Sequence, residues 1–228
     1  MVDEVCFPAA SLILNPLAPE LVVDQSPASD EAMLSIHLRD INTAVTKAWE
    51  QQFAGLHDVE VSCGDIFKHR ADAIVSPANS FGYMDGGIDL IYSRVLGRHL
   101  ERDLQALLRD RHFGELPVGQ AVILATDHPA IPYLVSSPTM RVPMGISRTA
   151  NVYLAFRAAL IAVKSHNETS ASKIASLLVP GLGTGVGDMP PERAARQMRV
   201  AYDAIIGGLG RKERNAGAIW GEHSDLLV

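Results

Sequence analysis

The sequence is poor in cysteine and has no hydrophobic run long enough to span a membrane. Its two cysteines, Cys6 and Cys63, form neither a disulfide framework nor a CxxC metal motif, and we expect Cys63 to be a packed thiol. The first residues, 1–4, are acidic and no long apolar stretch follows them, so no secretory signal peptide is expected. These absences predict a cytoplasmic protein that does not bind a membrane.

Basic residues are also few, because 20 lysines and arginines stand against 26 aspartates and glutamates, which gives a formal net charge of −6. A general nucleic-acid-binding protein needs a basic surface, so this class is disfavoured. A small anionic ligand is still compatible with the charge, since backbone N–H groups and helix dipoles can hold phosphates. The length of 228 residues and the hydrophobic content of 47% fit one globular domain with short extensions.

Several catalytic and cofactor motifs are missing. The eight histidines show no HExxH or other metal-ligand spacing, so no metal site is expected. Neither a GxxxxGK[ST] phosphate loop nor a GxSxG nucleophile elbow occurs. The segment Gly181-Leu182-Gly183 begins like a dinucleotide fingerprint, but its sixth position is Val186 rather than glycine or alanine. The sequence therefore implies no cofactor.

From residue 59 onward, apolar strand patterns alternate with helical patterns. This order predicts a three-layer α/β domain with a largely parallel sheet. Strands are expected at 59–63, 71–76, 121–125, 133–135 and 174–179. Helices are expected at 87–109, at 151–164 and from Pro190 onward.

The two ends of the chain differ from this alternating part. Before it, we expect a short strand at 11–15 and a helix from about 30 to 53. We therefore divide the chain into an N-terminal extension packed on the core, a central domain and a C-terminal tail that is disordered or loosely docked. The divisions are 1–58, 59–209 and 210–228.

Two glycine-rich loops each follow a predicted strand. The first contains Gly86 and Gly87 and opens a helix, and the second occupies residues 180–187. Ligands of open α/β sheets lie outside the carboxyl ends of the strands, so we expect both loops to line one cleft. Glycine lets the backbone approach a ligand and present its N–H groups. The loops therefore predict a site for a phosphorylated ligand.

The order of four motifs resembles the macro domain family, the ADP-ribose-binding module. The motifs are Gly64-Asp65-Ile66, the stretch DAIVSPAN at 72–79, Gly86-Gly87-Ile88-Asp89 and the loop at 180–187. The resemblance covers roughly residues 59–208. It implies a three-layer α/β/α fold with a mixed, largely parallel central sheet. It also implies that the partner is ADP-ribose or an ADP-ribosylated macromolecule.

The resemblance implies a role for single residues. Asp65, with the backbone of Ile66 beside it, matches the acid that accepts a hydrogen bond from the adenine amine. Asn79 matches the asparagine that holds the distal ribose. Asp89 matches the aspartate that positions or activates water in the hydrolases of the family, so Asp89 and Asn79 are the catalytic candidates. The other implied ligand contacts lie in the glycine loops: Gly86, Gly87, Ile88, Gly183, Thr184, Gly185, Val186 and Gly187.

Residue chemistry agrees with these roles, although each residue also has a structural explanation. A carboxylate binds an amine more strongly than a neutral oxygen does, and an asparagine can both donate to and accept from a ribose diol. Alternatively, Asp65 closes an Asx-turn, Asn79 satisfies backbone groups at the strand end, and Asp89 stabilises a helix start.

Three departures from the family pattern concern the enzyme hypothesis. The first loop, residues 81–87, lacks the run of three glycines common in the hydrolases of the family, and its Asp85 places a negative charge near the expected phosphates or turns away to cap the helix. Val186 lies near the position of a common aromatic residue, for which Tyr83 or Phe81 could substitute from the other side. After the central strand, residues 136–143 replace the family's usual histidine-containing stretch. Arg141 in this stretch pairs with a phosphate or with an acid such as Asp85, or it is an exposed loop cation.

Three functions therefore stay open. In the first, the protein hydrolyses ADP-ribose from a modified target or an ADP-ribose derivative, and the retained Asp89 and Asn79 favour this function. Alternatively, it is a non-catalytic reader of ADP-ribose or a related nucleotide, which the altered loops favour. The third alternative is an interaction domain that kept the fold and lost its ligand.

Overall fold

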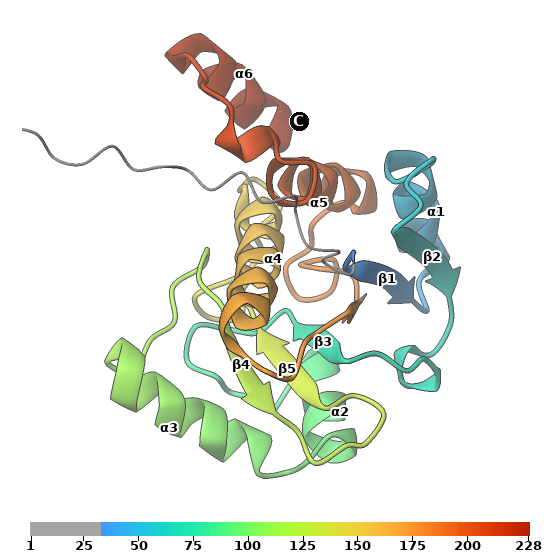
Figure 1. Cartoon of the computed structure of the whole chain (residues 1–228). Coiled ribbons are helices and arrows are strands. Elements are labelled where there is room, and N and C mark those ends of the chain that lie inside the picture. The colour runs from blue at the N-terminus through green and yellow to red at the C-terminus, as the bar shows by residue number, and fades with distance from the viewer. Residues whose placement is uncertain (1–32) are drawn as a thin grey trace, which may run out of the picture. The chain divides into compact units, whose positions relative to one another are not determined.

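The computed structural model describes residues 33–228, so the strand expected at 11–15 lies outside the described residues. The described chain forms one six-stranded sheet with helices on both faces (Figure 1). The strands are β1 (Ser35–Asp40), β2 (Val59–Cys63), β3 (Ala73–Ser76), β4 (Val122–Ala125), β5 (Tyr133–Ser136) and β6 (Ser176–Val179). The helices are α1 (Thr43–Gln52), α2 (Gly87–Val95), α3 (Leu100–His112), α4 (Asn151–Thr169), α5 (Pro191–Ile205) and α6 (Ala216–Leu227), with short 3₁₀ helices η1 (Ile66–Lys68) and η2 (Leu209–Arg211).

The strand order in the sheet is β2-β1-β6-β3-β5-β4. Every neighbouring pair is parallel except β4, which runs antiparallel to β5. The carboxyl ends of β1, β6, β3 and β5 therefore meet at one edge of the sheet. The predicted α/β/α fold with a mixed, largely parallel sheet is confirmed.

Helices α1, α4 and α5 cover one face of the sheet. Trp49, Phe156 and Met198, one from each helix, belong to the same core cluster as Ile36 and Leu38 of β1. All five side chains are almost fully buried. Burial of apolar area on this scale is the main favourable term in folding, so this cluster anchors the centre of the sheet.

Helix α2 and the start of α3 cover the other face of the sheet, over β6, β3 and β5. Tyr92 and Leu100 pack in one cluster with Ile74 of β3, Leu134 of β5 and Leu178 of β6. The hydroxyl of Tyr92 donates a hydrogen bond to the carbonyl of Val75 at 3.2 Å, which satisfies its polar end inside the core.

The helix expected from about 30 to 53 is wrong in its first part, because residues 35–40 form strand β1. Ile36 and Leu38 alternate with half-exposed neighbours, and this two-residue period is the pattern of a strand. The helix itself, α1, begins only after Asn42, whose side chain accepts a hydrogen bond from the N–H of Ala44. The helix expected at 87–109 is likewise two helices, and Gly97 between them has a positive φ of 140°.

The ends of the central domain also differ from expectation. Strand β1 and helix α1, both before residue 59, belong to the sheet and its helical cover; the division of the chain at residue 58 stays a prediction. After residue 210, the docked alternative describes the tail, because α6 packs against α5: Leu226 is buried, and its carbonyl accepts a hydrogen bond from Gln197 Nε2 at 2.7 Å. Cys63, expected to be packed, is exposed at the end of edge strand β2.

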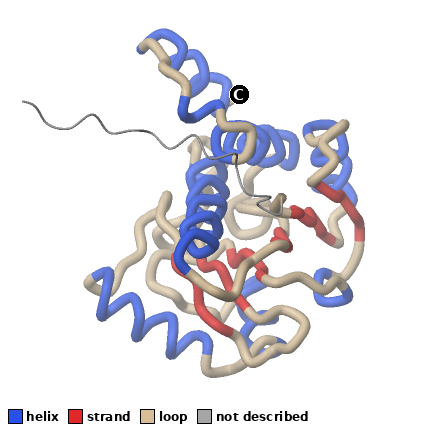
Figure 2. Tube along the Cα trace, in the orientation of Figure 1, coloured by secondary structure: helices blue, strands red, loops and turns tan. Residues whose placement is uncertain are grey.

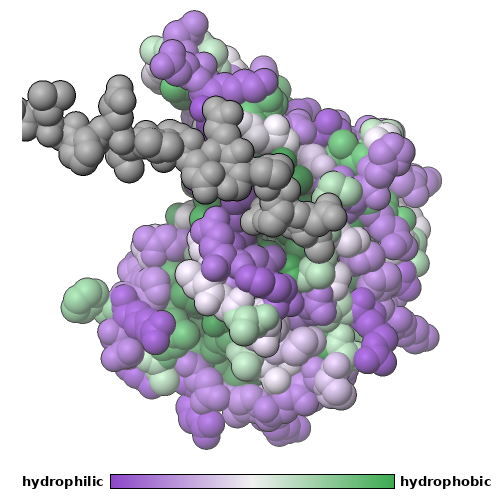
Figure 3. All heavy atoms as spheres, in the orientation of Figure 1, coloured by the Kyte–Doolittle hydropathy of each residue, from purple (hydrophilic) through white to green (hydrophobic). Residues whose placement is uncertain are grey.

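Within residues 33–228, none of the helices combines the length and the apolar character that crossing a membrane requires. The face shown in space-filling form is largely hydrophilic, with smaller hydrophobic areas (Figure 3). Many of the apolar side chains of the described helices pack in the clusters on the two faces of the sheet.

Candidate functional site

A cleft of about 490 Å³ lies at the carboxyl edge of the sheet. Its lining comes from the irregular segments that follow β1, β3, β5 and β6, drawn as loops in Figure 2, and from the first turns of α2. The structure thus brings the two glycine loops together at one cleft. The predicted site residues that line it are Asn79, Gly86, Gly87, Ile88, Asp89, Gly183, Thr184, Gly185, Val186 and Gly187.

Both loops offer backbone donors to this cleft. Among residues 33–228, the N–H groups of 183–187 have no protein acceptor. The N–H groups at the first turn of α2, residues 87–89, are free because a helix start has no preceding carbonyls. The positive end of the α2 dipole lies at the same turn. The cleft can therefore hold a diphosphate without a lysine or arginine.

The second loop owes its shape to tight internal contacts. The N–H of Met189 donates to the carbonyl of Gly183 at 3.0 Å, and the N–H of Asp188 donates to that of Gly185 at 3.0 Å. Gly183 has a φ of 69°, and a Cβ there would lie 2.8 Å from Cδ1 of Ile146. A side chain at Gly183 would strain the loop, whereas a Cβ at Gly185 would meet nothing within 4 Å.

Asp89 is buried in the wall of the cleft, in the first turn of α2. Burial raises the pKa of Asp89 to about 6, and the hydrogen bond from Ser76 Oγ to Asp89 Oδ1, at 2.6 Å, partly opposes this rise. A carboxyl group with such a pKa can exchange a proton near neutral pH. The arrangement is therefore suited to orienting a water molecule or accepting a proton from it.

Asn79 lines the cleft and also organises the first loop. Its Nδ2 donates to the carbonyl of Tyr83 at 2.8 Å, and its Oδ1 accepts from the N–H of Phe81 at 3.0 Å. The alternative that Asn79 satisfies backbone groups after the strand is thus realised. Tyr83 lines the cleft as well, as one of the two aromatic residues considered for this side, and Phe81 does not.

Asp65 and Ile66, predicted at the far end of the cleft, are not part of its lining. They follow β2, and β1 lies between β2 and β6, so they stand one strand away from the cleft edge. The Asp65 carboxylate caps η1 by accepting a hydrogen bond from the N–H of Phe67 at 3.0 Å. Asp65 therefore closes an Asx-turn, as its structural alternative predicts. A contact of Asp65 with the adenine base stays a prediction, because Asp65 does not line the cleft.

The residues found at that end of the cleft are Asp40, Ile41 and Asn42, which directly follow β1. Asp40 Oδ2 accepts a hydrogen bond from the N–H of Gly181 at 2.9 Å, and Oδ1 accepts from the N–H of Asn42 at 2.8 Å. Sequence reasoning missed them because it placed this segment inside a helix. The available signal was the Asp-Ile pair at 40–41, which repeats the pair at 65–66 after a strand.

The charged residues near the first loop divide into two groups. Asp85 is exposed and lines the cleft. Arg141 does not pair with it: its guanidinium binds the carboxylate of Glu115 through two hydrogen bonds of 2.8 and 3.0 Å. The same guanidinium lies 5.0 Å from the ring centroid of Phe81, within the range of a cation–π contact. Arg141 thus braces the outside of the loop and does not line the cleft.

The comparisons with known proteins agree on one family. The model of the macro domain family matches residues 75–198. An uncharacterized protein of Aquifex aeolicus is 36% identical over 141 residues, which are 62% of this chain and 78% of that protein. A Pantoea vagans protein named O-acetyl-ADP-ribose deacetylase 1 is 31% identical over 148 residues, which are 64% of this chain and 80% of that protein.

Solved structures show the same fold. The macrodomain of Mycobacterium tuberculosis DarG matches with a TM-score of 0.53 and 22% identity, over 63% of this chain and 88% of that chain. The Oceanobacillus iheyensis macrodomain with ADP matches with a TM-score of 0.50 and 22% identity, over 60% of this chain and 72% of that chain.

Proposed function

We propose that this chain, which belongs to the macro domain family, binds ADP-ribose in the cleft between its two glycine loops. The ADP-ribose is either free or attached to a macromolecule. The observation that carries the proposal is the pairing of two sets of free backbone N–H groups, at 183–187 and 87–89, on the lining of one cleft. A diphosphate needs several converging donors of this kind.

The size of the cleft agrees with a nucleotide ligand. A volume of about 490 Å³ falls within the range of roughly 300–1,000 Å³ that small-molecule sites occupy. The Oceanobacillus iheyensis structure with the same fold contains ADP, which supports a ligand of this class. The net charge of −6 is no obstacle, because the donors are backbone groups and a helix start.

For the base end of the ligand, we assign Asp40 the role first predicted for Asp65. Asp40 lines the cleft, and its two backbone partners leave lone pairs of the carboxylate for a further donor such as the adenine amine. Ile41 and Asn42 line the same end. The position of Asp40 beside the start of the second glycine loop supports this assignment, since Gly181 is bound to it directly.

Hydrolysis of an ADP-ribose linkage is the second candidate function, and the geometry of Asp89 favours it. This carboxyl group lies in the cleft wall with a pKa near 6, beside the loop that Asn79 organises. In this function Asp89 orients a water molecule toward the anomeric carbon while the two loops hold the diphosphate.

Calorimetry with ADP-ribose tests the proposal, and a de-modification assay on an ADP-ribosylated protein runs beside it. Binding with turnover selects the hydrolase, and binding without turnover selects the reader. At about a hundred times the dissociation constant, ADP-ribose should stabilise the fold by roughly 2.7 kcal/mol. Absence of heat and of a thermal shift with ADP-ribose, ADP and NAD would contradict the proposal.

A further inference from the structure

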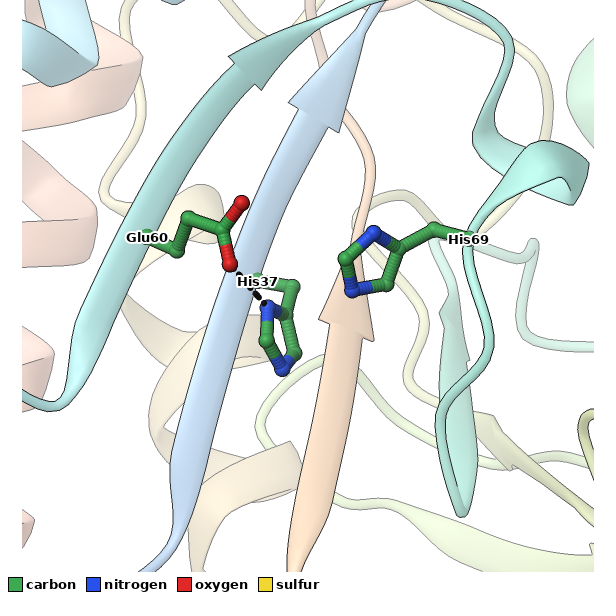
Figure 4. Close-up of side chains that lie close together, drawn as sticks. All are labelled: His37, Glu60 and His69. Carbon is green, nitrogen blue, oxygen red and sulfur yellow. Dashed lines mark hydrogen bonds and ion pairs between the residues drawn. The ribbon is translucent and has the colours of Figure 1, made fainter.

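Outside the cleft, two histidines and a glutamate lie together on one face of the sheet (Figure 4). His37 of β1 and Glu60 of β2 are direct partners in the parallel register, so their side chains stand side by side. His69 directly follows η1, and its ring lies 4.3 Å from that of His37, centroid to centroid. None of the three lines the cleft.

The spacing of the three side chains fits a single metal ion. One ligand atom from each, two imidazole nitrogens and a carboxylate oxygen, lies within 4.8 Å of the others. Ligand atoms at 2.0–2.2 Å from a tetrahedral zinc ion lie roughly 3.3–3.6 Å from one another. A small contraction of the group is therefore enough to bring all three atoms to an ion.

The surroundings of His37 resemble the support that metal-binding histidines receive. Its Nδ1 lies 3.0 Å from Glu60 Oε2, and its Nε2 lies 3.2 Å from Ser35 Oγ. With Nδ1 on a metal, the hydroxyl of Ser35 can accept the proton of Nε2 and fix the tautomer. The side chain of His37 is 16% exposed and that of Glu60 is 58% exposed, so an ion can reach the group from solvent.

The charges of the neighbouring groups allow a cation to bind. The nearby cation Arg39 is occupied elsewhere: its guanidinium donates to the Asp65 carbonyl at 2.9 Å and to Ser62 Oγ at 2.8 Å. The carboxylate of Glu60 has no lysine or arginine partner in the described part of the chain.

We propose that His37, Glu60 and His69 bind one divalent transition-metal ion of the zinc class. Two imidazoles and one carboxylate are a ligand set that zinc accepts, with the fourth position open to water. The ion would tie the segment after η1 to β1 and β2, which are already paired with each other in the sheet. The site is separate from the cleft and does not depend on the function proposed for it.

The test titrates Zn²⁺ into the full chain after treatment with a chelator, with calorimetry and thermal unfolding as readouts. The wild-type protein should bind one equivalent and unfold at a higher temperature with Zn²⁺. The variants His69→Gln and Glu60→Gln should each weaken binding by at least about ten-fold. Both positions are at least partly exposed, so these variants should unfold like the wild type without metal.

The matched control is His57→Gln, which changes an exposed histidine outside the group. It should bind Zn²⁺ like the wild type. No saturable binding by the wild type would overturn the proposal. Equal affinity in the wild type, His69→Gln and Glu60→Gln would also overturn it, because other ligands would then hold the ion.

Discussion

Ser76, the last residue of β3, donates a hydrogen bond from its Oγ to Oδ1 of Asp89 in the first turn of α2, at 2.6 Å. This contact joins the end of a central strand to the helix that the first glycine loop opens. Both side chains are buried, and only Asp89 is part of the cleft lining. The carboxyl group of Asp89 therefore takes part both in the contact between β3 and α2 and in the lining of the cleft.

Replacement of Asp89 by asparagine should change the pH dependence of stability. The pKa of Asp89 is about 6 in the folded state and 3.8 as the reference value, so between these values the folded state keeps a proton that the unfolded state has lost. The wild type should lose stability as pH rises from about 4 to about 6, by at most about 3 kcal/mol. Urea unfolding at several pH values measures this change in the free energy of unfolding.

In the Asp89→Asn variant this loss should be absent, so its stability relative to the wild type should grow as pH rises and level off above about pH 6. Parallel stability curves for the two proteins across this window would show that Asp89 has an ordinary pKa.

Replacement of Asp89 by alanine separates catalysis from binding. If Asp89 orients the attacking water, turnover should fall at least about ten-fold, because positioned acid–base groups contribute this much or more. ADP-ribose should still bind, since the diphosphate donors are backbone groups. Unchanged turnover in this variant would remove Asp89 from the mechanism.

A negative charge on the second glycine loop should block the ligand. In Gly185→Glu the new side chain meets no neighbour at its Cβ, so the fold should tolerate it while the carboxylate repels a diphosphate. Calorimetry should show at least about ten-fold weaker binding of ADP-ribose. The matched control is Gly221→Glu on α6, which makes the same change in open space outside the cleft and should bind normally.

The two Asp-Ile pairs can be told apart by a change of base. If Asp40 accepts the adenine amine, the wild type should prefer ADP-ribose over the inosine analogue, which lacks that amine, by about ten-fold. Asp40→Asn should lose most of this preference, and Asp65→Asn should keep it, because Asp65 caps η1 outside the cleft. The reverse outcome would restore Asp65 to the base site.

Gln197 of α5 connects three segments from inside the fold. Its Oε1 accepts from the N–H of Tyr153, and its Nε2 donates to the carbonyls of Thr149 and Leu226, each at 2.7 Å. Gln197→Met keeps the length of the side chain and leaves these buried groups unpaired, so it should cost roughly 2–4 kcal/mol in urea unfolding. The exposed Gln51→Met should change stability by less than about 0.5 kcal/mol.

The fold could be predicted from local patterns because its elements follow one another in regular alternation. Strands such as β3 and β6 are short apolar runs followed directly by proline, and α4 and α5 show helical periods. The error at β1 has a local cause, since Ile36 and Ile41 also fit the helical pattern that continues into α1. The alternation of Leu34, Ile36 and Leu38 with polar residues is the local strand pattern, and the pairing of β1 with both β2 and β6 confirms it.

The α/β fold and the two glycine loops after strands can be read from the chain alone, because periodicity and glycine act locally. The remaining features depend on the order and register of strands that lie far apart in the sequence. Placing β1 between β2 and β6 brings Asp40 to the cleft in place of Asp65. The same register sets His37 beside Glu60, a pairing that sequence spacing cannot reveal because it arises from hydrogen bonding between strands.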